Sequence, residues 1–376
     1  MNIAFIHNSK KLHTGAHFIN DLIAQGLRDK GVAVNEFYPK RELLEHPNNL
    51  KGLANILFFY SLLENKRKIL RNDIIQGTTY TPITFLAFHK PVVSHFGSTT
   101  FGFLQSTPRA HCINENTKNI IYKLRNDGVL PELNIRTKRP LRDVMEIEQY
   151  VAQRATKVIA TSNLVRNELI AQHVTPDKIV VIHNAIENFW FENTTQKPSN
   201  PHLVFVGRLG NDAFLWKLKG IDRLIGIYQK FPLLPKMSFF MTINDRLEPW
   251  MQKHVRNHTG YYNVLKPDIK HTLQNLYGSI FLLTSRYEGF SLSLIEAMSQ
   301  GLVPVAYPVG VVPEIIINGK NGYIVHNQKE MIERINELLK NEKKRLYMSK
   351  QSKHTASNFQ VATLVDSLIS LYSFIT

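Results

Sequence analysis

The sequence predicts an α/β protein made of two tandem, doubly wound domains, each with a parallel sheet covered by helices. Short apolar strands alternate with amphipathic helices along the chain, which is the pattern of parallel sheets. A polar segment without periodicity interrupts this alternation once, at residues 187–202. The length of 376 residues also favours two domains over one. We therefore expect domains at residues 1–186 and 203–357, joined by a linker at residues 187–202.

The first domain opens with a strand, a helix and a second strand. Residues 2–6 (NIAFI) form an apolar run, residues 17–30 carry apolar side chains at helical spacing, and Gly31 ends that helix before the next strand. Such a βαβ unit requires a parallel sheet. The same reading gives further strands at residues 91–95, 157–161 and 178–182, and helices at residues 146–155 and 163–173.

The second domain repeats the pattern directly after the linker. The expected strands lie at residues 203–207, 237–243, 280–284 and 303–306, and the expected helices at residues 222–231, 269–277, 291–300 and 328–341. Ligands of open α/β sheets bind outside the carboxyl ends of the strands, so two such domains can hold one ligand in a cleft. A final apolar helix, at about residues 358–376, is expected to pack back on the first domain.

Composition excludes several classes of protein. The single cysteine, Cys112, rules out an intrachain disulfide and a cysteine-cluster zinc site. The first ten residues lack the order of a signal peptide, and the longest apolar stretch, residues 54–63, is far shorter than the roughly 20 residues of a membrane span. We therefore expect a cytoplasmic protein. The net charge of +16 calls for an anionic partner: nucleic acid, a lipid surface or a phosphorylated substrate.

Residues 285–301 (SRYEGFSLSLIEAMSQG) carry the strongest chemical signal. A turn with Glu288 and Gly289 follows a buried strand, and Ser291 is a favoured N-cap residue for the next helix. The start of that helix offers backbone N–H groups and a positive dipole end to an anion. Glu288 and Glu296 can accept hydroxyl hydrogens beside it. The pattern favours a sugar-linked diphosphate, while spacing alone leaves a capped surface helix with two solvated glutamates as an equal alternative.

The same stretch resembles the fingerprint of a known enzyme family, the retaining glycosyltransferases of family 4. The family pattern is E-G-F-x-x-x-x-x-E-A-M-x-x-G-x-P-V. Residues 288–305 read EGFSLSLIEAMSQGLVPV, with one extra residue, Leu302, before the closing motif. Upstream, GRL at residues 207–209 and KGID at residues 219–222 resemble the family's G-R-L…K-G-x-D element. The resemblance covers nearly the whole chain and is weaker in the first domain.

The resemblance implies a GT-B fold, in which two Rossmann-like domains face each other across a cleft, and a set of donor-binding residues. Arg208 and Lys219 would bind the donor diphosphate, with Lys217 as the alternative to Lys219. Glu296 would bind the ribose hydroxyls. Glu288 would contact the donor sugar, which makes it a candidate catalytic residue. The backbone around the helix start completes the donor site, at Gly289, Phe290, Ser291 and Leu292.

Two candidates come from the first domain. His95-Phe96-Gly97 resembles the family's H-x-G turn, whose histidine lies near the donor sugar and the acceptor, so His95 is the second candidate catalytic residue. Gly15 stands where the family has a Gly-Gly loop over the phosphates, so it is a further donor-binding candidate.

The implied activity is the retaining transfer of a hexose-type sugar from a nucleoside-diphosphate sugar, with UDP favoured over GDP. The acceptor would be a hydroxyl of a glycan or lipid-linked molecule in cell-surface polysaccharide or lipopolysaccharide synthesis. We expect no metal ion and no cofactor, because no Asp-x-Asp, G-x-G-x-x-G or P-loop motif occurs. A sugar-nucleotide epimerase or glycan phosphorylase of the same fold, and a non-catalytic protein that binds anionic surfaces, remain alternatives.

Two basic clusters in the first domain point to an anionic membrane surface as a further partner. Lys66, Arg67, Lys68 and Arg71 follow the apolar run at residues 56–63. The second cluster consists of Arg136, Lys138, Arg139 and Arg142. Each basic residue near an anionic bilayer contributes about 1 kcal/mol. A solvated face is an equal alternative for both clusters. We expect peripheral docking at the inner face of the membrane and no nucleic-acid partner.

Overall fold

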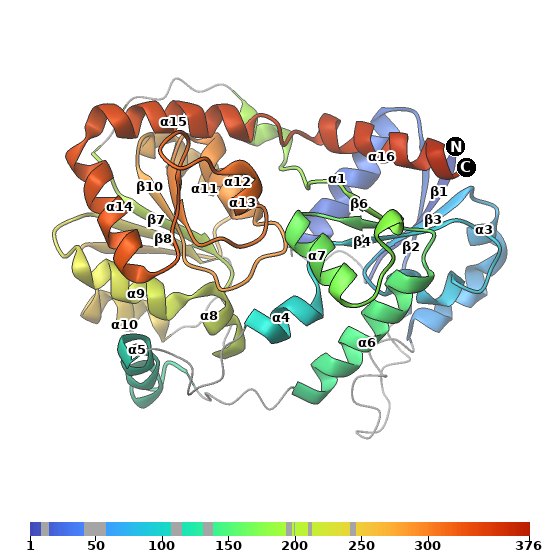
Figure 1. Ribbon diagram of the computed structural model, residues 1–376, viewed down its shortest axis with the longest axis horizontal. Coiled ribbons are helices and arrows are strands. Elements are labelled where there is room, and N and C mark those ends of the chain that lie inside the picture. Colours follow the sequence, from blue (N-terminus) through green and yellow to red (C-terminus); the bar gives the residue numbers. More distant parts are fainter. Residues whose placement is uncertain are drawn as a thin grey trace. The chain divides into compact units, whose positions relative to one another are not determined.

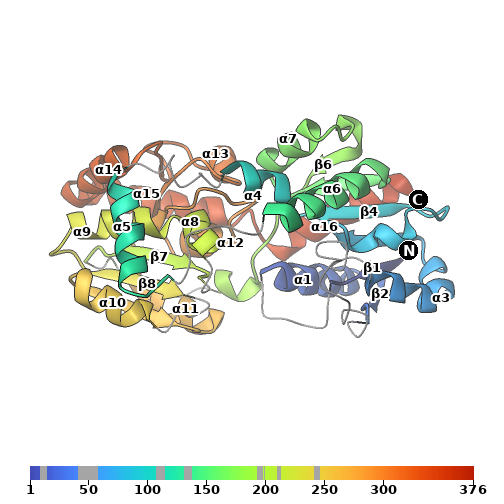
Figure 2. The ribbon, with the colours of Figure 1, turned by 90° about the horizontal axis from the view of Figure 1, so that it is seen from below.

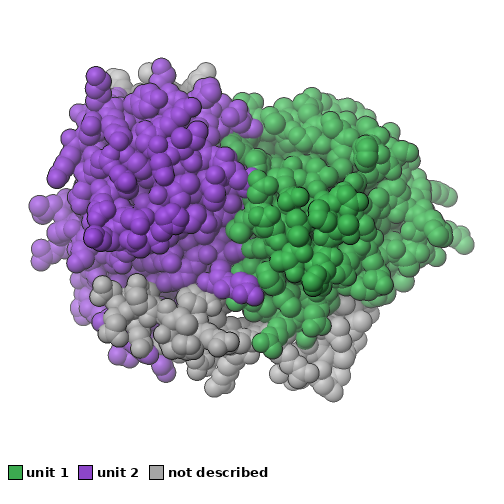
Figure 3. Space-filling model, in the orientation of Figure 1, with its two compact units in different colours: residues 1–104, 136–187, 359–376 green, residues 105–135, 188–358 purple. Residues whose placement is uncertain are grey.

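The computed structural model divides into two compact units (Figure 3). Unit 1 contains Met1–Leu104, Arg136–Glu187 and Phe359–Thr376, and unit 2 contains Gln105–Ile135 and Asn188–Asn358. The structure describes residues 1–8, 15–40, 58–106, 115–130, 138–192, 198, 200–209, 213–240 and 246–376. Each unit has one six-stranded sheet in this described part of the chain. All strand pairs are parallel, which confirms the predicted α/β class with two doubly wound sheets.

The sheet of unit 1 has the strand order β2-β1-β3-β4-β5-β6. Its strands are β1 Asn2–Ile6, β2 Ala33–Phe37, β3 Ile74–Thr78, β4 Val92–Phe96, β5 Lys157–Ala160 and β6 Ile179–Val181. Its helices are α1 Gly15–Asp29, α3 Lys66–Leu70, α6 Lys138–Arg154, α7 Asn163–Ala171 and α16 Val361–Ile375; α4 Thr100–Ser106 crosses the boundary at Leu104. Short 3₁₀ turns lie at η3 Phe58–Asn65, η4 Thr81–Phe85 and η6 Pro176–Lys178. β4 is buried along its whole length and is central to this sheet.

The C-terminal helix α16 belongs to unit 1, where it packs on α1 (Figure 1). The close approach needs a glycine, because a Cβ on Gly26 of α1 would lie 2.5 Å from the side chain of Val365. The buried Tyr372 hydroxyl also donates a hydrogen bond to the Gln76 side chain in β3. These contacts tie the last helix to a central strand of the unit 1 sheet.

The sheet of unit 2 has the order β12-β11-β10-β7-β8-β9. Its strands are β7 Leu203–Gly207, β8 Lys236–Phe240, β9 His258–Tyr262, β10 Ile280–Leu283, β11 Val303–Ala306 and β12 Tyr323–Ile324. Its helices are α5 Glu115–Asn126, α8 Ala213–Lys219, α9 Ile221–Lys230, α10 Leu247–His254, α11 Lys266–Leu273, α12 Leu292–Ser299, α13 Val312–Ile315, α14 Gln328–Lys340 and α15 Glu342–Ala356, with 3₁₀ turns at η7 Asn188–Phe191 and η8 Gln274–Leu276. From β7 the sheet is extended on one side by β8 and β9 and on the other side by β10, β11 and β12, so the direction in which strands are added reverses between β7 and β10.

Residues 105–135 belong to unit 2, whereas the boundaries expected from the sequence place them in the first domain. Helix α5 in this segment packs on α9 (Figures 1 and 2). The Trp250 indole N–H donates to the Asp127 carboxylate at 2.7 Å, and the Arg246 guanidinium donates to the Gly128 carbonyl at 2.8 Å. Both bonds join residues more than a hundred positions apart, so no local sequence pattern could reveal them.

The structure also adds detail to two further segments of unit 1. The helix expected at residues 146–155 begins earlier, at Lys138, so Arg142 of the second basic cluster lies on α6. Of the apolar run at residues 56–63, the structure describes the part from Phe58 onward, which lies in the 3₁₀ turn η3 (Phe58–Asn65). Phe59 and Leu62 are buried there, whereas Tyr60 and Leu63 are exposed. No helix in the described part of the chain combines the length and apolar character that a membrane span requires.

Candidate functional site

The candidate site in unit 2 lies at the carboxyl ends of β7 and β10. These strands are neighbours in the sheet and mark the point where the strand order reverses, which is where open α/β sheets bind ligands. Arg208 directly follows β7 and is exposed. Residues 284–291 follow β10 and lead to α12. The topology therefore brings the two sequence motifs, 80 positions apart, to one edge of one sheet.

Glu288 and Lys219 form the centre of this site. The Lys219 ammonium donates to Glu288 Oε1 at 2.6 Å, and the Ser285 hydroxyl donates to the same oxygen at 2.7 Å. The two charged side chains are 21% and 13% exposed, so a ligand can still reach them. Both bonds use Oε1, and among the described residues Oε2 accepts no hydrogen bond and makes no ion pair. The pair therefore offers an oriented carboxylate oxygen and an ammonium group side by side.

Lys217, the alternative to Lys219, has a different environment. Its side chain is buried, and burial lowers its pKa; the nearby Arg286 lowers the pKa further while Asp222 opposes the shift. Lys219 therefore lies beside Glu288, whereas Lys217 lies in the interior near the Arg286–Asp222 pair.

Backbone contacts bind the segment carrying Lys219 to the segment carrying Glu288. Gly220, between α8 and α9, has a φ of +64°, and a Cβ there would lie 2.0 Å from the Thr284 carbonyl oxygen, so only glycine fits. The Thr284 hydroxyl donates to the Lys219 carbonyl at 3.0 Å, and the Arg286 N–H donates to the Leu218 carbonyl at 2.7 Å. The distance between the two functional side chains is thus set by main chain.

Arg286 and Asp222 reinforce this connection, although neither is among the site residues that the sequence predicts. The guanidinium donates to both carboxylate oxygens at 2.7 Å, and its Nη1 also donates to the Lys217 carbonyl at 2.7 Å. The side chains are only 7% and 2% exposed. Bidentate pairing fixes the planar guanidinium in one orientation. Two features of the sequence could have pointed to this pair: Asp222 closes the K-G-x-D element, and Arg286 lies two residues before Glu288.

Ser291 differs from its expected role as a capping residue. It occupies the N-cap position of α12, but its side chain accepts no hydrogen bond from the helix. Its φ of +90° lies in the left-handed region, and its buried hydroxyl has no hydrogen-bond partner among the described residues. Strained backbone and an unsatisfied buried hydroxyl are features of ligand sites. Gly310 packs against this turn, because a Cβ there would lie 2.6 Å from the Phe290 carbonyl oxygen.

The other donor-binding candidates surround this helix start. Gly289 and Phe290 are buried, and Leu292 is half-buried at the first position of α12. Glu296 lies in the second turn of the helix and is 4% exposed. Its Oε1 pairs with the Lys266 ammonium at 2.9 Å. Lys266 is absent from the sequence candidates, because it lies 30 positions upstream in a segment without a recognisable pattern.

His95 and Gly15 belong to unit 1. His95 is still within strand β4 and is 2% exposed, and neither ring nitrogen makes a hydrogen bond of normal geometry among the described residues. Burial lowers the pKa of His95 to about 4, although the nearby Asn184 amide opposes the shift. The imidazole is therefore neutral near pH 7. Gly15 is the first residue of α1, and the loop before it, residues 9–14, lies outside the described residues.

Two family models match the chain in succession. The model for Glycosyltransferase Family 4 matches residues 20–188, and the model for Glycosyl transferases group 1 matches residues 187–355. The second match includes all of the unit 2 candidates, and the first includes His95.

Curated relatives match the chain over shorter segments. Spore coat protein SA of Bacillus subtilis is 35% identical over 124 residues, which are 31% of this chain and 32% of that protein. Alpha-maltose-1-phosphate synthase of Mycolicibacterium smegmatis is 22% identical over 204 residues, or 48% of this chain and 51% of that protein. The chain thus spans a third to a half of these two relatives. A 41.2 kDa protein in the cps region of Klebsiella pneumoniae is 25% identical over 77% of this chain and 81% of its own length.

Solved structures match over the full length. Sucrose-phosphate synthase from Thermosynechococcus elongatus aligns with a TM-score of 0.75 at 14% identity and covers 100% of this chain and 99% of that one. WaaG, a glycosyltransferase involved in lipopolysaccharide biosynthesis, aligns with a TM-score of 0.69 at 14% identity and covers 100% of this chain and 99% of that one. Anabaena HepE in complex with UDP-glucose gives 0.68 at 16% identity over 99% of both chains. Because the two family matches together run from residue 20 to residue 355 and the fold is that of these neighbours, the chain belongs to the group 1 glycosyltransferases of the GT-B architecture.

Proposed function

We propose that the chain transfers a hexose-type sugar from a nucleoside-diphosphate sugar to a hydroxyl of a glycan or lipid-linked acceptor, with retention of the anomeric configuration. The observation that carries the proposal is the Lys219–Glu288 pair, 2.6 Å apart at the carboxyl ends of β7 and β10. A donor needs both groups at once: a cation for its diphosphate and a carboxylate for its sugar hydroxyls. The relatives in a cps region and in lipopolysaccharide biosynthesis support cell-surface polysaccharide or lipopolysaccharide synthesis as the setting.

The diphosphate would lie between Arg208, Lys219 and the start of α12. Negative charge develops on the leaving diphosphate in the transition state, and two cations with a helix N-terminus stabilise it in a partly dry site. The Lys219 ammonium has three donors, so it can keep its bond to Glu288 while it donates to a phosphate oxygen. The unpartnered hydroxyl of Ser291 supplies a further donor. These groups provide the charge in our proposal, which includes no metal ion and no cofactor.

The sugar and the ribose would take the two glutamates. Glu288 Oε2 would accept a hydroxyl hydrogen of the donor sugar, while Oε1 keeps its bonds to Lys219 and Ser285. Glu296 would accept the ribose hydroxyls. For His95 and Gly15, which belong to unit 1, the roles that the resemblance implies stay predictions. Crystals of HepE contain UDP and UDP-glucose, which supports UDP over GDP as the nucleotide.

A nucleotide panel tests the proposal. UDP-, GDP- and ADP-sugars are added to the purified protein, and thermal unfolding is recorded. A donor present at a hundred times its Kd raises the free energy of unfolding by about 2.7 kcal/mol. Unit 2, at about 200 residues, gains roughly 2–4 °C in Tm per kcal/mol, so we expect a rise of about 5–10 °C with a UDP-sugar. No shift with any nucleotide would refute the proposal and favour a non-catalytic protein.

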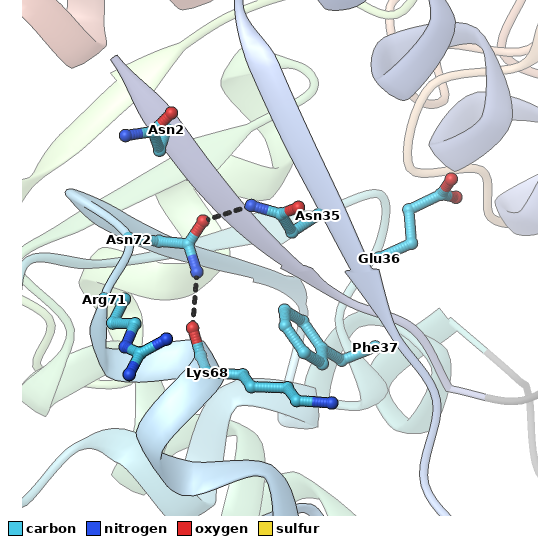
Figure 4. Close-up of a pocket in the computed structure, with 7 residues that line it drawn as sticks. All are labelled: Asn2, Asn35, Glu36, Phe37, Lys68, Arg71 and Asn72. Atoms are coloured by element: carbon cyan, nitrogen blue, oxygen red, sulfur yellow. Dashed lines mark hydrogen bonds between the residues drawn. The ribbon is translucent and has the colours of Figure 1, made fainter.

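We also propose that unit 1 docks on an anionic membrane surface. Tyr60 and Leu63 of η3 are 48% and 39% exposed, and the basic residues of α3 and its C-cap follow them directly. Lys68 and Arg71 have no ion-pair partner among the described residues, and both line a polar cavity of about 520 Å³ (Figure 4). The cavity is lined by Asn2, Asn35, Glu36, Phe37, Lys68, Arg71 and Asn72. Exposed apolar side chains beside unpaired cations fit the headgroup region of a bilayer.

Vesicle sedimentation tests the docking surface. Replacing both Lys68 and Arg71 by glutamine removes two charges, worth about 2 kcal/mol, so binding to vesicles with anionic lipid should fall roughly thirtyfold. A control variant replaces Lys343 and Lys350, two exposed lysines of α15, and should bind as the wild type does. Equal losses in both variants would show that only net charge matters and would contradict a defined surface. The second basic cluster stays a prediction, since Arg136 and the side chains of Lys138 and Arg139 lie outside the described residues.

A further inference from the structure

A buried ion pair lies on the ribose side of the proposed donor site. The Lys266 ammonium is 2.9 Å from Glu296 Oε1, and the two side chains are only 9% and 5% exposed. Lys266 is the first residue of α11, which begins after the edge strand β9, and Glu296 lies in the second turn of α12. The lysine thus comes from a different strand–helix connection than any of the sequence candidates.

Two features of its position are unfavourable for a lysine. The first turn of a helix is the positive end of the helix dipole, where carboxylates such as the neighbouring Asp268 are favoured. Burial of an ammonium group also costs free energy unless a carboxylate compensates it. A buried ion pair is seldom more stable than apolar residues of similar size, so fold stability alone does not account for this pair.

The pair has a direct consequence for hydroxyl binding by Glu296. A buried carboxylate without a cation is costly to keep charged, and Lys266 offsets that cost. An ionised carboxylate offers about four acceptor positions, so it can bind the ammonium and two vicinal hydroxyls together. Hydrogen bonds from hydroxyls to a charged acceptor are about twice as strong as those to a neutral one.

We propose that Lys266 is the positioning residue that sets the preference of this site for ribonucleotides, because it holds Glu296 charged and oriented toward the ribose hydroxyls. The inference rests on the proposed function, since it takes the donor to be a nucleoside diphosphate. It goes further in assigning the discrimination between ribose and deoxyribose to a residue that need not touch the ligand.

Equilibrium binding of UDP, GDP and ADP, each beside its 2′-deoxy counterpart, tests the inference by calorimetry. The nucleotide that binds wild type best is carried forward. Wild type should prefer the ribonucleotide tenfold or more, as expected for one hydrogen bond to a charged acceptor. Lys266→Met should reduce that preference to less than about threefold, and Lys266→Arg should retain most of it.

Lys270→Met is the matched control. Lys270 lies on the same helix, is 8% exposed and pairs with Glu192 at 3.3 Å, so its loss removes a comparable buried ammonium. This variant should keep the wild-type preference. If Lys266→Met fails to fold, as judged by circular dichroism, Lys266→Gln replaces it; the amide keeps a donor without a charge and should give an intermediate preference.

The outcomes separate the two proposals. A preference that persists unchanged in Lys266→Met, or that is absent in wild type although a nucleotide binds, overturns this inference and leaves the donor site in place. Equal loss of preference in the Lys266 and Lys270 variants also overturns it, because any buried lysine would then have the same effect. Failure of wild type to bind any nucleoside diphosphate overturns the proposed function itself.

Discussion

The buried Arg286–Asp222 pair offers the sharpest test of how the donor site is held together. It joins the β10–α12 turn, which carries Glu288, to the start of α9, which follows Lys219. The guanidinium is 7% exposed and the carboxylate 2%. Replacing either residue alone leaves the other buried without its charge partner. We predict that both single variants lose stability, and that Arg286→Met loses more than Asp222→Asn.

The structure sets the expected size of each effect. Breaking a buried pair costs about 3–5 kcal/mol. Asp222→Asn falls at the lower end, because an amide oxygen still accepts one bond and Arg286 keeps its 2.7 Å bond to the Lys217 carbonyl. Arg286→Met falls at the upper end, because Asp222 is almost fully buried. At 2–4 °C per kcal/mol, the Tm should fall by roughly 6–12 °C and 10–20 °C respectively. The double variant Asp222→Leu with Arg286→Met should recover much of the loss, since it leaves no buried charge.

Urea denaturation and thermal unfolding, with and without a UDP-sugar, provide the assay. The control is Asp366→Asn, which breaks the exposed Lys30–Asp366 ion pair at 2.8 Å and should cost less than about 1 kcal/mol. Losses below about 1 kcal/mol in both single variants, or a double variant less stable than either, would show that the pair does not hold these two segments together.

Further predictions concern the glycine at the α8–α9 junction and the histidine of β4. Gly220→Ala should cost about 2–4 kcal/mol in urea denaturation, because the new Cβ would lie 2.0 Å from the Thr284 carbonyl oxygen in addition to the strain of a φ of +64°. Gly319→Ala, with a φ of +78° and open space around its Cβ, should lose only about 1 kcal/mol, and equal losses would contradict the close contact. His95 has a pKa of about 4 when folded and 6.5 when unfolded, so the unfolded state binds more protons between these values and wild type should lose up to about 3 kcal/mol as pH falls from 6.5 to 4. His95→Gln should lose less stability over that range, and identical pH profiles would count against a buried neutral imidazole.

The sequence predicted most of the fold because most strands are short apolar runs. Most strands of both sheets, and the final helix, follow from the periodicity of apolar residues. Strand β3 (IIQGT) was not predicted, because Gln76 and Gly77 interrupt its apolar run. Gln76 is nevertheless fully buried, and its Oε1 accepts a hydrogen bond from the Tyr372 hydroxyl of α16. Strand β9 (HTGYY) escaped because it is an edge strand with mixed polarity. The burial of a polar residue in a strand can be predicted only when its distant hydrogen-bond partner is known.

The donor-site residues divide in the same way. Glu288 and Lys219 could be found because each lies in a short local motif, EGF at residues 288–290 and KGID at residues 219–222. Their mutual contact, at 2.6 Å, depends on Gly220 and on the order of strands, which periodicity does not specify. Ser291 was expected to cap α12 on residue type, but it has a φ of +90° and its side chain accepts no hydrogen bond from the helix. Lys266 could not be found, because it lies in no local motif and only its ion pair with Glu296 on another helix marks it as part of the site.

Sugar release and transfer from a UDP-sugar, measured for wild type, Glu288→Gln and Arg208→Ala, tests the donor site most directly. All three proteins should show the same circular dichroism spectrum, because neither substitution removes a fully buried side chain. Wild type should turn over, and each variant should lose about a hundredfold or more in turnover, the size expected when one group that stabilises transition-state charge is removed. Unchanged turnover in both variants would contradict the central claim that the edge between β7 and β10 is the donor site.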